Sequence, residues 1–141
     1  MTRITFFHGA QDRLQTIADW LTQPEQRGKP ILVFAPDAEQ ADKLDQLLWT
    51  HPATGFIAHC RAGDALESET PLVISSTPDS PPHDQCLLNF SNQMPSDFSR
   101  FADLIEIISI DDRDRLPGRE RFRVYRERGY TLENRDISGG L

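Results

Sequence analysis

The sequence has no long apolar run and few cysteines, and both absences restrict the class of protein. No stretch approaches the roughly 20 apolar residues that a helix needs to cross a bilayer, and Met1–Ala10 lacks the basic start and apolar centre of a signal peptide. The two cysteines, Cys60 and Cys86, are too few for a disulfide framework. We therefore expect a cytoplasmic protein with free thiols and no membrane contact.

Positive charge is also scarce, because 15 basic residues stand against 22 acidic ones and give a formal net charge of −7. A surface of this sign repels phosphate backbones and anionic membranes. This charge disfavours a protein that coats DNA or RNA by itself. We expect DNA to be reached only through partner proteins.

The glycine motifs that bind nucleotide phosphates are missing. The first apolar run ends in Phe7-His8-Gly9-Ala10, which contains one glycine. A dinucleotide site needs three, and a P-loop needs a second glycine followed by Lys and Ser or Thr. We therefore expect no nucleotide cofactor.

Zinc-ligand and nucleophile patterns are incomplete as well. Adjacent His59 and Cys60 would point to opposite faces of a strand, so only His83 and Cys86 have the spacing of a zinc-ligand pair. No Gly-x-Ser-x-Gly sequence occurs, and neither cysteine precedes an identifiable strand-to-helix elbow. The sequence therefore predicts neither a structural zinc site nor a hydrolytic triad.

Acidic residues after the last long apolar run leave one alternative open. Asp111, Asp112 and Asp114 could hold Mg²⁺, although such a run more often caps a helix. We expect Asp112 or Asp114 to be the cap, because Pro117 soon after is tolerated in a first helical turn. The expected cofactor and metal content is none. The alternative function is a nucleotide- or metal-dependent enzyme that uses the sheet edge near His8 and Asp111.

The apolar residues alternate between short runs typical of buried strands and longer runs with helical spacing, which indicates parallel strands joined by crossover helices. The predicted strands are Ile4–Phe7, Ile31–Ala35, Phe56–His59, Leu72–Ser75, Leu87–Phe90 and Leu104–Ile110, the last near the sheet centre. The predicted helices are Gln11–Thr22, a segment that starts at Pro36-Asp37 and one within Asp111–Arg128, before a polar tail to Leu141. At 141 residues, the chain should form one α/β domain over 1–141.

Arginine is concentrated near the end of the chain. On a helix, Arg119, Arg123 and Arg126 fall at i, i+4 and i+7, and the rings of Phe122 and Tyr125 flank this ridge. One interpretation is a docking helix with its rings on the core and its arginines in solvent. The other is a pocket in which guanidinium groups hold a carboxylate beside an apolar site.

Several segments over most of the chain form an ordered set. They are Thr5-Phe6, Gly28-Lys29, Asp37–Asp45 before Leu47-Leu48-Trp49 and Pro52, Phe56-Ile57 with His59, Ala62-Gly63, and Arg119–Tyr125 with Gly129. This set resembles the family of chi subunits of bacterial DNA polymerase III. The segment Arg-Glu-Arg-Phe-Arg-Val-Tyr is the most specific of these. The resemblance implies a single three-layer Rossmann-like α/β domain with a mainly parallel sheet and no nucleotide chemistry.

The resemblance also implies a non-catalytic accessory subunit of the polymerase holoenzyme. Members of this family bind the acidic C-terminal tail of single-stranded-DNA-binding protein, which carries a phenylalanine and a free carboxylate. They are linked to the clamp loader through the psi subunit. Carried over residue by residue, the tail-binding site comprises Arg119, Arg115, Phe122, Arg123 and Ile108, with Tyr125 and Gly129 also matching the family pattern. The interface with psi comprises Trp49 and Phe56.

Overall fold

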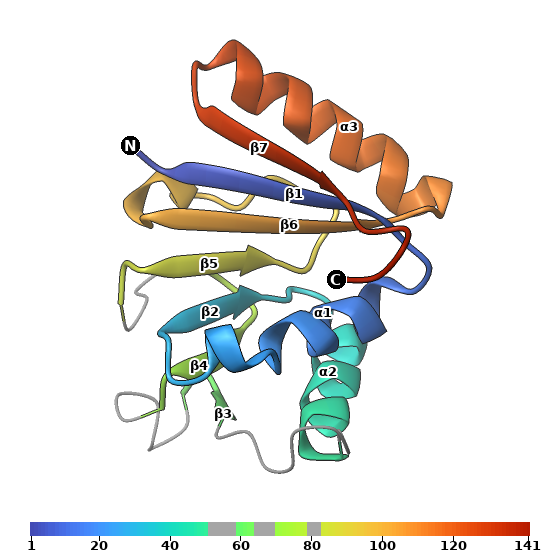
Figure 1. Ribbon diagram of the computed structural model, residues 1–141. Coiled ribbons are helices and arrows are strands. Elements are labelled where there is room, and N and C mark those ends of the chain that lie inside the picture. Colours follow the sequence, from blue (N-terminus) through green and yellow to red (C-terminus); the bar gives the residue numbers. More distant parts are fainter. Residues whose placement is uncertain (51–58, 64–69, 79–82) are drawn as a thin grey trace.

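Seven parallel strands and three α-helices make up the computed structural model, which describes residues 1–50, 59–63, 70–78 and 83–141 (Figure 1). The strands are β1 (Arg3–Ala10), β2 (Ile31–Phe34), β3 (His59–Arg61), β4 (Leu72–Ser75), β5 (Cys86–Asn89), β6 (Asp103–Ser109) and β7 (Thr131–Asp136). The helices are α1 (Arg13–Leu21), α2 (Ala38–Thr50) and α3 (Asp112–Glu127), with short 3₁₀ turns at Pro24–Gln26 and Phe98–Arg100.

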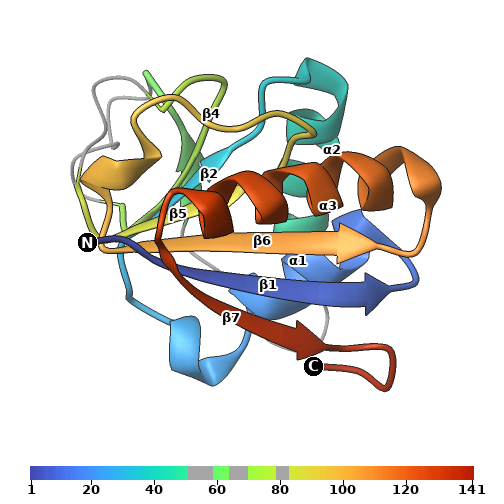
Figure 2. The same cartoon turned by 90° about the horizontal axis from the view of Figure 1, so that it is seen from above.

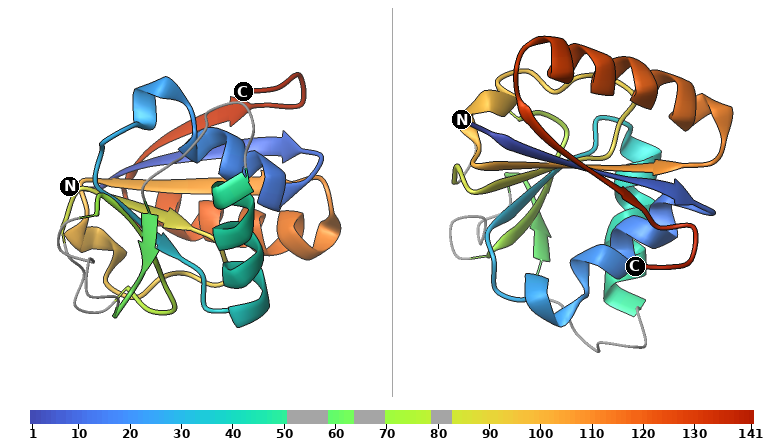
Figure 3. Two further views of the ribbon diagram at one scale, coloured as in Figure 1. Left: turned by 90° about the horizontal axis from the view of Figure 1, so that it is seen from below. Right: turned by 45° about the horizontal axis from the view of Figure 1, so that its top comes forward.

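The strands form a single sheet in the order β3-β4-β2-β5-β6-β1-β7. Helices α1 and α2 cover one face of this sheet and α3 covers the other, which gives three layers (Figures 2 and 3). The prediction of a mainly parallel α/β sheet is confirmed, since every strand pair is parallel. The arrangement is consistent with a Rossmann-like fold.

Local sequence explains where the first two helices begin. The carboxylate of Asp12 accepts a hydrogen bond from the backbone N–H of Gln15, and Asp37 does the same for Glu39 and Gln40. Such side-chain caps satisfy N–H groups that the first helical turn leaves without partners. The apolar faces of both helices are buried against the sheet, through Ile17, Ala18 and Leu21 of α1 and Ala41, Leu44 and Leu48 of α2.

The predicted strands fall in the right places with shifts of a few residues. β4 has the predicted bounds, and β6 lies inside the sheet between β5 and β1. Of the predicted strand Phe56–His59, only His59 lies within the described residues, where it opens β3.

The predicted polar tail after Gly129 is wrong, because Thr131–Asp136 forms strand β7 at the edge of the sheet. This strand pairs in parallel with β1 from Arg3↔Thr131 to His8↔Asp136. An edge strand is held by backbone hydrogen bonds and exposes most of its side chains, so it does not need the apolar pattern of a buried strand. For that reason its sequence resembles a polar tail.

Two apolar clusters fill the spaces on either side of the sheet. The larger joins α1 and α2 to the sheet, and the smaller lies under α3 and includes Phe6, Phe98 and Tyr125. No helix in the described ranges is long and apolar enough to cross a membrane. The face under α3 is where the basic segment of the sequence meets β1 and β6.

Candidate functional site

The acidic run Asp111–Asp114 starts α3 rather than standing free at the sheet edge. Asp111, not Asp112 or Asp114 as predicted, is the N-cap, and its carboxylate accepts from the backbone N–H of Arg113 at 2.8 Å. The Arg113 guanidinium also donates to it, and these bonds lower the pKa of Asp111 to about 2. Asp112 pairs with Arg115, and Asp114 accepts from the Ser109 hydroxyl.

These pairings bear on the alternative of a metal-dependent enzyme. The acidic side chains of the run are each engaged by an arginine or a hydroxyl. Among the residues that the structure describes, no group of three or more His, Cys, Asp or Glu side chains could hold a metal ion. The observed geometry of this run is that of a helix start.

Helix α3 begins earlier than expected and continues through Pro117, which lies in its second turn. Proline has no N–H, so the carbonyl of Arg113 loses its usual helical donor. The side-chain amide of Asn92 donates to that carbonyl at 3.0 Å and replaces the lost bond. This contact from the loop after β5 lets the helix accommodate a proline that would otherwise disrupt it.

A close approach between α3 and β6 forms the floor of a pocket. Gly118 is buried, and a Cβ atom at this position would lie 3.0 Å from Cδ1 of Ile108. The absence of a side chain therefore brings the helix backbone down onto the strand. A larger residue would push α3 away from Ile108 or distort the isoleucine side chain.

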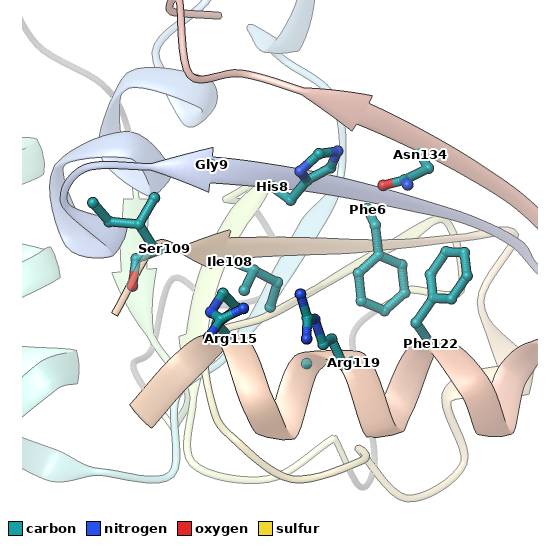
Figure 4. A pocket seen from close by; sticks show the side chains of 11 residues that line it. Phe6, His8, Gly9, Ile108, Ser109, Arg115, Arg119, Phe122 and Asn134 are labelled. Atoms are coloured by element: carbon teal, nitrogen blue, oxygen red, sulfur yellow. The ribbon is translucent and has the colours of Figure 1, made fainter. Parts of the chain in front are cut away.

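The pocket lies between α3, β1 and β6, with β7 at its outer side, and has a volume of about 380 Å³ (Figure 4). It is lined by Phe6, His8, Gly9, Ile108, Ser109, Ile110, Arg115, Gly118, Arg119, Phe122 and Asn134. Apolar side chains dominate the lining, and Arg115 and Arg119 rise from the helix toward it. Phe122 packs edge-on against Phe6, with ring centroids 5.1 Å apart.

Arg119 differs from most arginines of α3 in its electrostatic partners. Arg113, Arg115 and Arg123 each pair with a carboxylate on the same helix or its cap. Arg119 is exposed and makes no ion pair within the described part of the chain. A guanidinium beside an apolar pocket, without an internal anion, is suited to hold a carboxylate from another molecule.

The structure brings together four of the residues predicted for tail binding and separates three others from them. Ile108, Arg115, Arg119 and Phe122 line one pocket. Arg123 instead pairs with Glu120 and Glu127 on the exposed side of the helix, Tyr125 is fully buried, and Gly129 follows the helix end with φ +86°.

Ile108 is the strand residue of this pocket that the sequence predicted. His8 was assigned only to the enzyme alternative, and Phe6, Ser109 and Asn134 were not predicted as site residues. Parallel pairing of β1 with both β6 and β7 places these residues side by side, since Phe6 is in register with Asn134 and His8 with Ile108. Asn134 could have been predicted as a pocket residue only if β7 had been recognised as a strand, and its polar sequence does not indicate one.

A buried ion pair under α3 was also missed. Arg121 donates to both carboxylate oxygens of Glu106 at 3.0 Å, and the pair is almost completely shielded from solvent. The same carboxylate accepts from the Tyr125 hydroxyl and the Asn89 amide. Burial and the neighbouring carboxylate raise the pKa of Tyr125. An acid inside the apolar run Leu104–Ile110 could have indicated a buried partner.

Of the two residues predicted for the psi interface, Trp49 lies on the α2 side of the molecule, away from the α3 pocket. Trp49, near the end of α2, is 52% exposed, and its ring lies 4.9 Å from that of His59. His59 is buried and contacts the carboxylate of Asp45 at 2.7 Å. Phe56 lies outside the described residues. Trp49 is thus a large apolar side chain at the surface, which distinguishes it from the tryptophan in α1, Trp20, which is buried.

Comparison with known proteins gives one consistent result. The family model described as "DNA polymerase III chi subunit, HolC" matches residues 1–133. A DNA polymerase III subunit chi from Pseudomonas aeruginosa is 27% identical over 138 residues, covering 95% of this chain and 96% of the relative. The subunit chi of Escherichia coli strain K12 is 25% identical over 119 residues, which cover 84% of this chain and 81% of the relative. The subunit chi of Haemophilus influenzae is 26% identical over 111 residues, which cover 78% of this chain and 77% of the relative.

Proposed function

The chain belongs to the family of DNA polymerase III chi subunits, which are accessory subunits, and we propose that its α3 pocket binds the acidic C-terminal tail of single-stranded-DNA-binding protein. In this proposal the protein catalyses no reaction. It links the tail to the clamp loader through the psi subunit, and it reaches DNA only through these partners.

The observation that carries this proposal is the position of Arg119 at an apolar pocket, where no carboxylate of the described residues pairs with it. A terminal phenylalanine would place its ring against Ile108 and Phe122. Its free carboxylate would accept hydrogen bonds from the Arg119 fork, with Arg115 adding positive charge. Both properties of such a tail, the ring and the carboxylate, are thereby matched by one site.

The charge of the molecule predicts how binding responds to salt. The whole chain carries a net charge of −7, so attraction of an acidic tail depends on the local field of the arginines. Exposed charges of this kind are screened within about 8 Å at physiological ionic strength. We expect a Kd in the micromolar range, about −8 kcal/mol, that weakens as salt is added.

Exposure of Trp49 supports the proposed psi interface. Trp49 belongs to α2, which covers the face of the sheet opposite α3 (Figure 3). Large exposed aromatic side chains are enriched at protein interfaces. A psi contact on the α2 side would leave the α3 pocket accessible to a tail, so one chain could hold both partners together.

Replacement of Arg119 tests the proposed function. We expect Arg119→Ala to weaken binding of an acidic peptide ending in phenylalanine by roughly tenfold or more, because a charge-assisted carboxylate contact is lost. Isothermal titration calorimetry measures the affinity. Amidation of the peptide terminus should weaken binding to the wild type by a similar factor and should add little in the variant.

Arg123→Ala is the matched control, since it removes the same charge from the same helix at a position outside the pocket. We expect less than a twofold change in affinity. Equal loss in both variants would mean that only the general charge of α3 matters. Unchanged affinity in Arg119→Ala would refute the pocket as the binding site.

A further inference from the structure

We infer that Arg126 forms a second anion subsite, which holds an acidic side chain three residues before the carboxyl terminus of the bound tail. This inference rests on the proposed function and adds the direction in which the tail runs. Arg126 belongs to the arginine ridge of the sequence but is not among the residues that the family resemblance assigns to the tail-binding site. Some arginines of α3 form ion pairs with carboxylates of the described residues, and others do not.

Arg126 shares two properties with Arg119. It is exposed, and it makes no ion pair with a carboxylate in the described residue ranges. Its guanidinium lies over the ring of Phe122, 5.9 Å from the centroid. Phe122 is itself part of the pocket lining, so Arg126 continues the pocket toward the end of α3.

Helical spacing puts these residues on one stripe. Phe122 lies three residues after Arg119 and four before Arg126, which places all three on the same side of α3. We call Arg119, Phe122 and Arg126 the α3 stripe. Arg123 differs from these two arginines because its guanidinium is already paired with Glu120 and Glu127.

The length of the stripe sets the spacing that a ligand must have. Seven residues of helix separate Arg119 from Arg126, which is about 10 Å along the axis. An extended peptide advances about 3.3 Å per residue, so this distance corresponds to about three residues. A tail whose terminal carboxylate lies at Arg119 would therefore present its third residue upstream to Arg126.

The direction is set by the apolar part of the site. Ile108 and Gly118 lie toward the start of α3, and Phe122 lies between the two free arginines. Beyond Phe122 the same side of the molecule continues to Leu132, which is partly buried in the cluster under α3. A tail that ends in the pocket thus leaves it along the second half of the helix, toward Arg126.

A double-mutant cycle tests this inference on the full chain. The probe is a synthetic acidic nonapeptide with a C-terminal phenylalanine and a free carboxylate, compared with peptides in which one acidic residue at a time becomes its amide. We expect Arg126→Gln to weaken binding of the parent peptide about threefold, because an ion pair exposed to solvent contributes little to affinity. With the amide at the third position before the terminus, Arg126→Gln should have almost no effect.

Arg128→Gln is the matched control, because Arg128 is also exposed and without an ion pair in the described residues but does not lie over Phe122. Equal losses in Arg126→Gln and Arg128→Gln, or an identical response of Arg126→Gln to amides at every position, would overturn the subsite. Loss of binding in Arg119→Ala together with no effect of Arg126→Gln would overturn the subsite alone. Wild-type affinity in Arg119→Ala would overturn the proposed function instead.

Discussion

The inner side of α3 and its pocket-facing stripe use the same residue types in opposite ways. On the inner side, Arg121 is buried with its charge balanced by Glu106, and the hydroxyl of Tyr125 donates to the same carboxylate. On the α3 stripe, Arg119 is exposed and without an ion pair in the described residues, and Phe122 lines a cavity. The charges of the inner side are balanced within the fold, whereas the stripe leaves charge exposed to solvent beside an apolar pocket.

The difference shows that residue type alone does not identify a binding residue. Arg119 and Arg121 stand two positions apart, which on a helix turns them to different sides. Only Arg121 meets a carboxylate on the sheet, since Glu106 lies under the helix. A substitution at Glu106 should therefore affect folding, while one at Arg119 should affect binding.

Removal of the buried carboxylate should have the largest effect. We expect Glu106→Gln to lower the free energy of unfolding by about 3 kcal/mol or more, because it leaves the Arg121 charge buried without a counter-charge. Urea denaturation followed by circular dichroism measures the loss. A double variant, Glu106→Leu with Arg121→Met, should recover much of it, and a single variant as stable as the wild type would contradict the comparison.

Alkaline pH should destabilise the inner side through Tyr125. Burial, reinforced by Glu106, raises the pKa of its phenol above the unfolded value of about 10. Its stabilising contribution is therefore complete below pH 10 and falls as pH rises, by up to about 1.4 kcal/mol per pH unit. Urea denaturation between pH 9 and pH 11 should show a steeper loss in the wild type than in Tyr125→Phe. Parallel curves would contradict this prediction.

A smaller effect is expected where α3 accommodates its proline. Asn92→Ala should lower the free energy of unfolding by about 1 kcal/mol, because the carbonyl of Arg113 loses its donor. In a Pro117→Ala background the helical N–H is restored, so the cost of losing that bond should shrink. Chemical denaturation of the four proteins gives the coupling, and additive losses would show that Asn92 acts through its contacts with Arg13 or Asp114 instead.

The sequence predicted the elements that have a strong apolar pattern. Leu72–Ser75 and Leu104–Ser109 have the apolar pattern of buried strands because both of their faces are covered, and the apolar positions of the first two helices follow helical spacing. It also predicted four of the residues that line the pocket, Ile108, Arg115, Arg119 and Phe122, through the resemblance to a known family. It did not predict β7, whose side chains are mostly exposed.

By itself the sequence determined a parallel α/β fold and a basic, aromatic helix near its end, since both follow from local periodicity and composition. Only the tertiary structure decided that Arg121 is buried against Glu106, a carboxylate 15 residues away on β6, and that β7 lies beside β1 at the pocket. Periodicity describes one element at a time, whereas the pocket exists only where three strands and a helix meet.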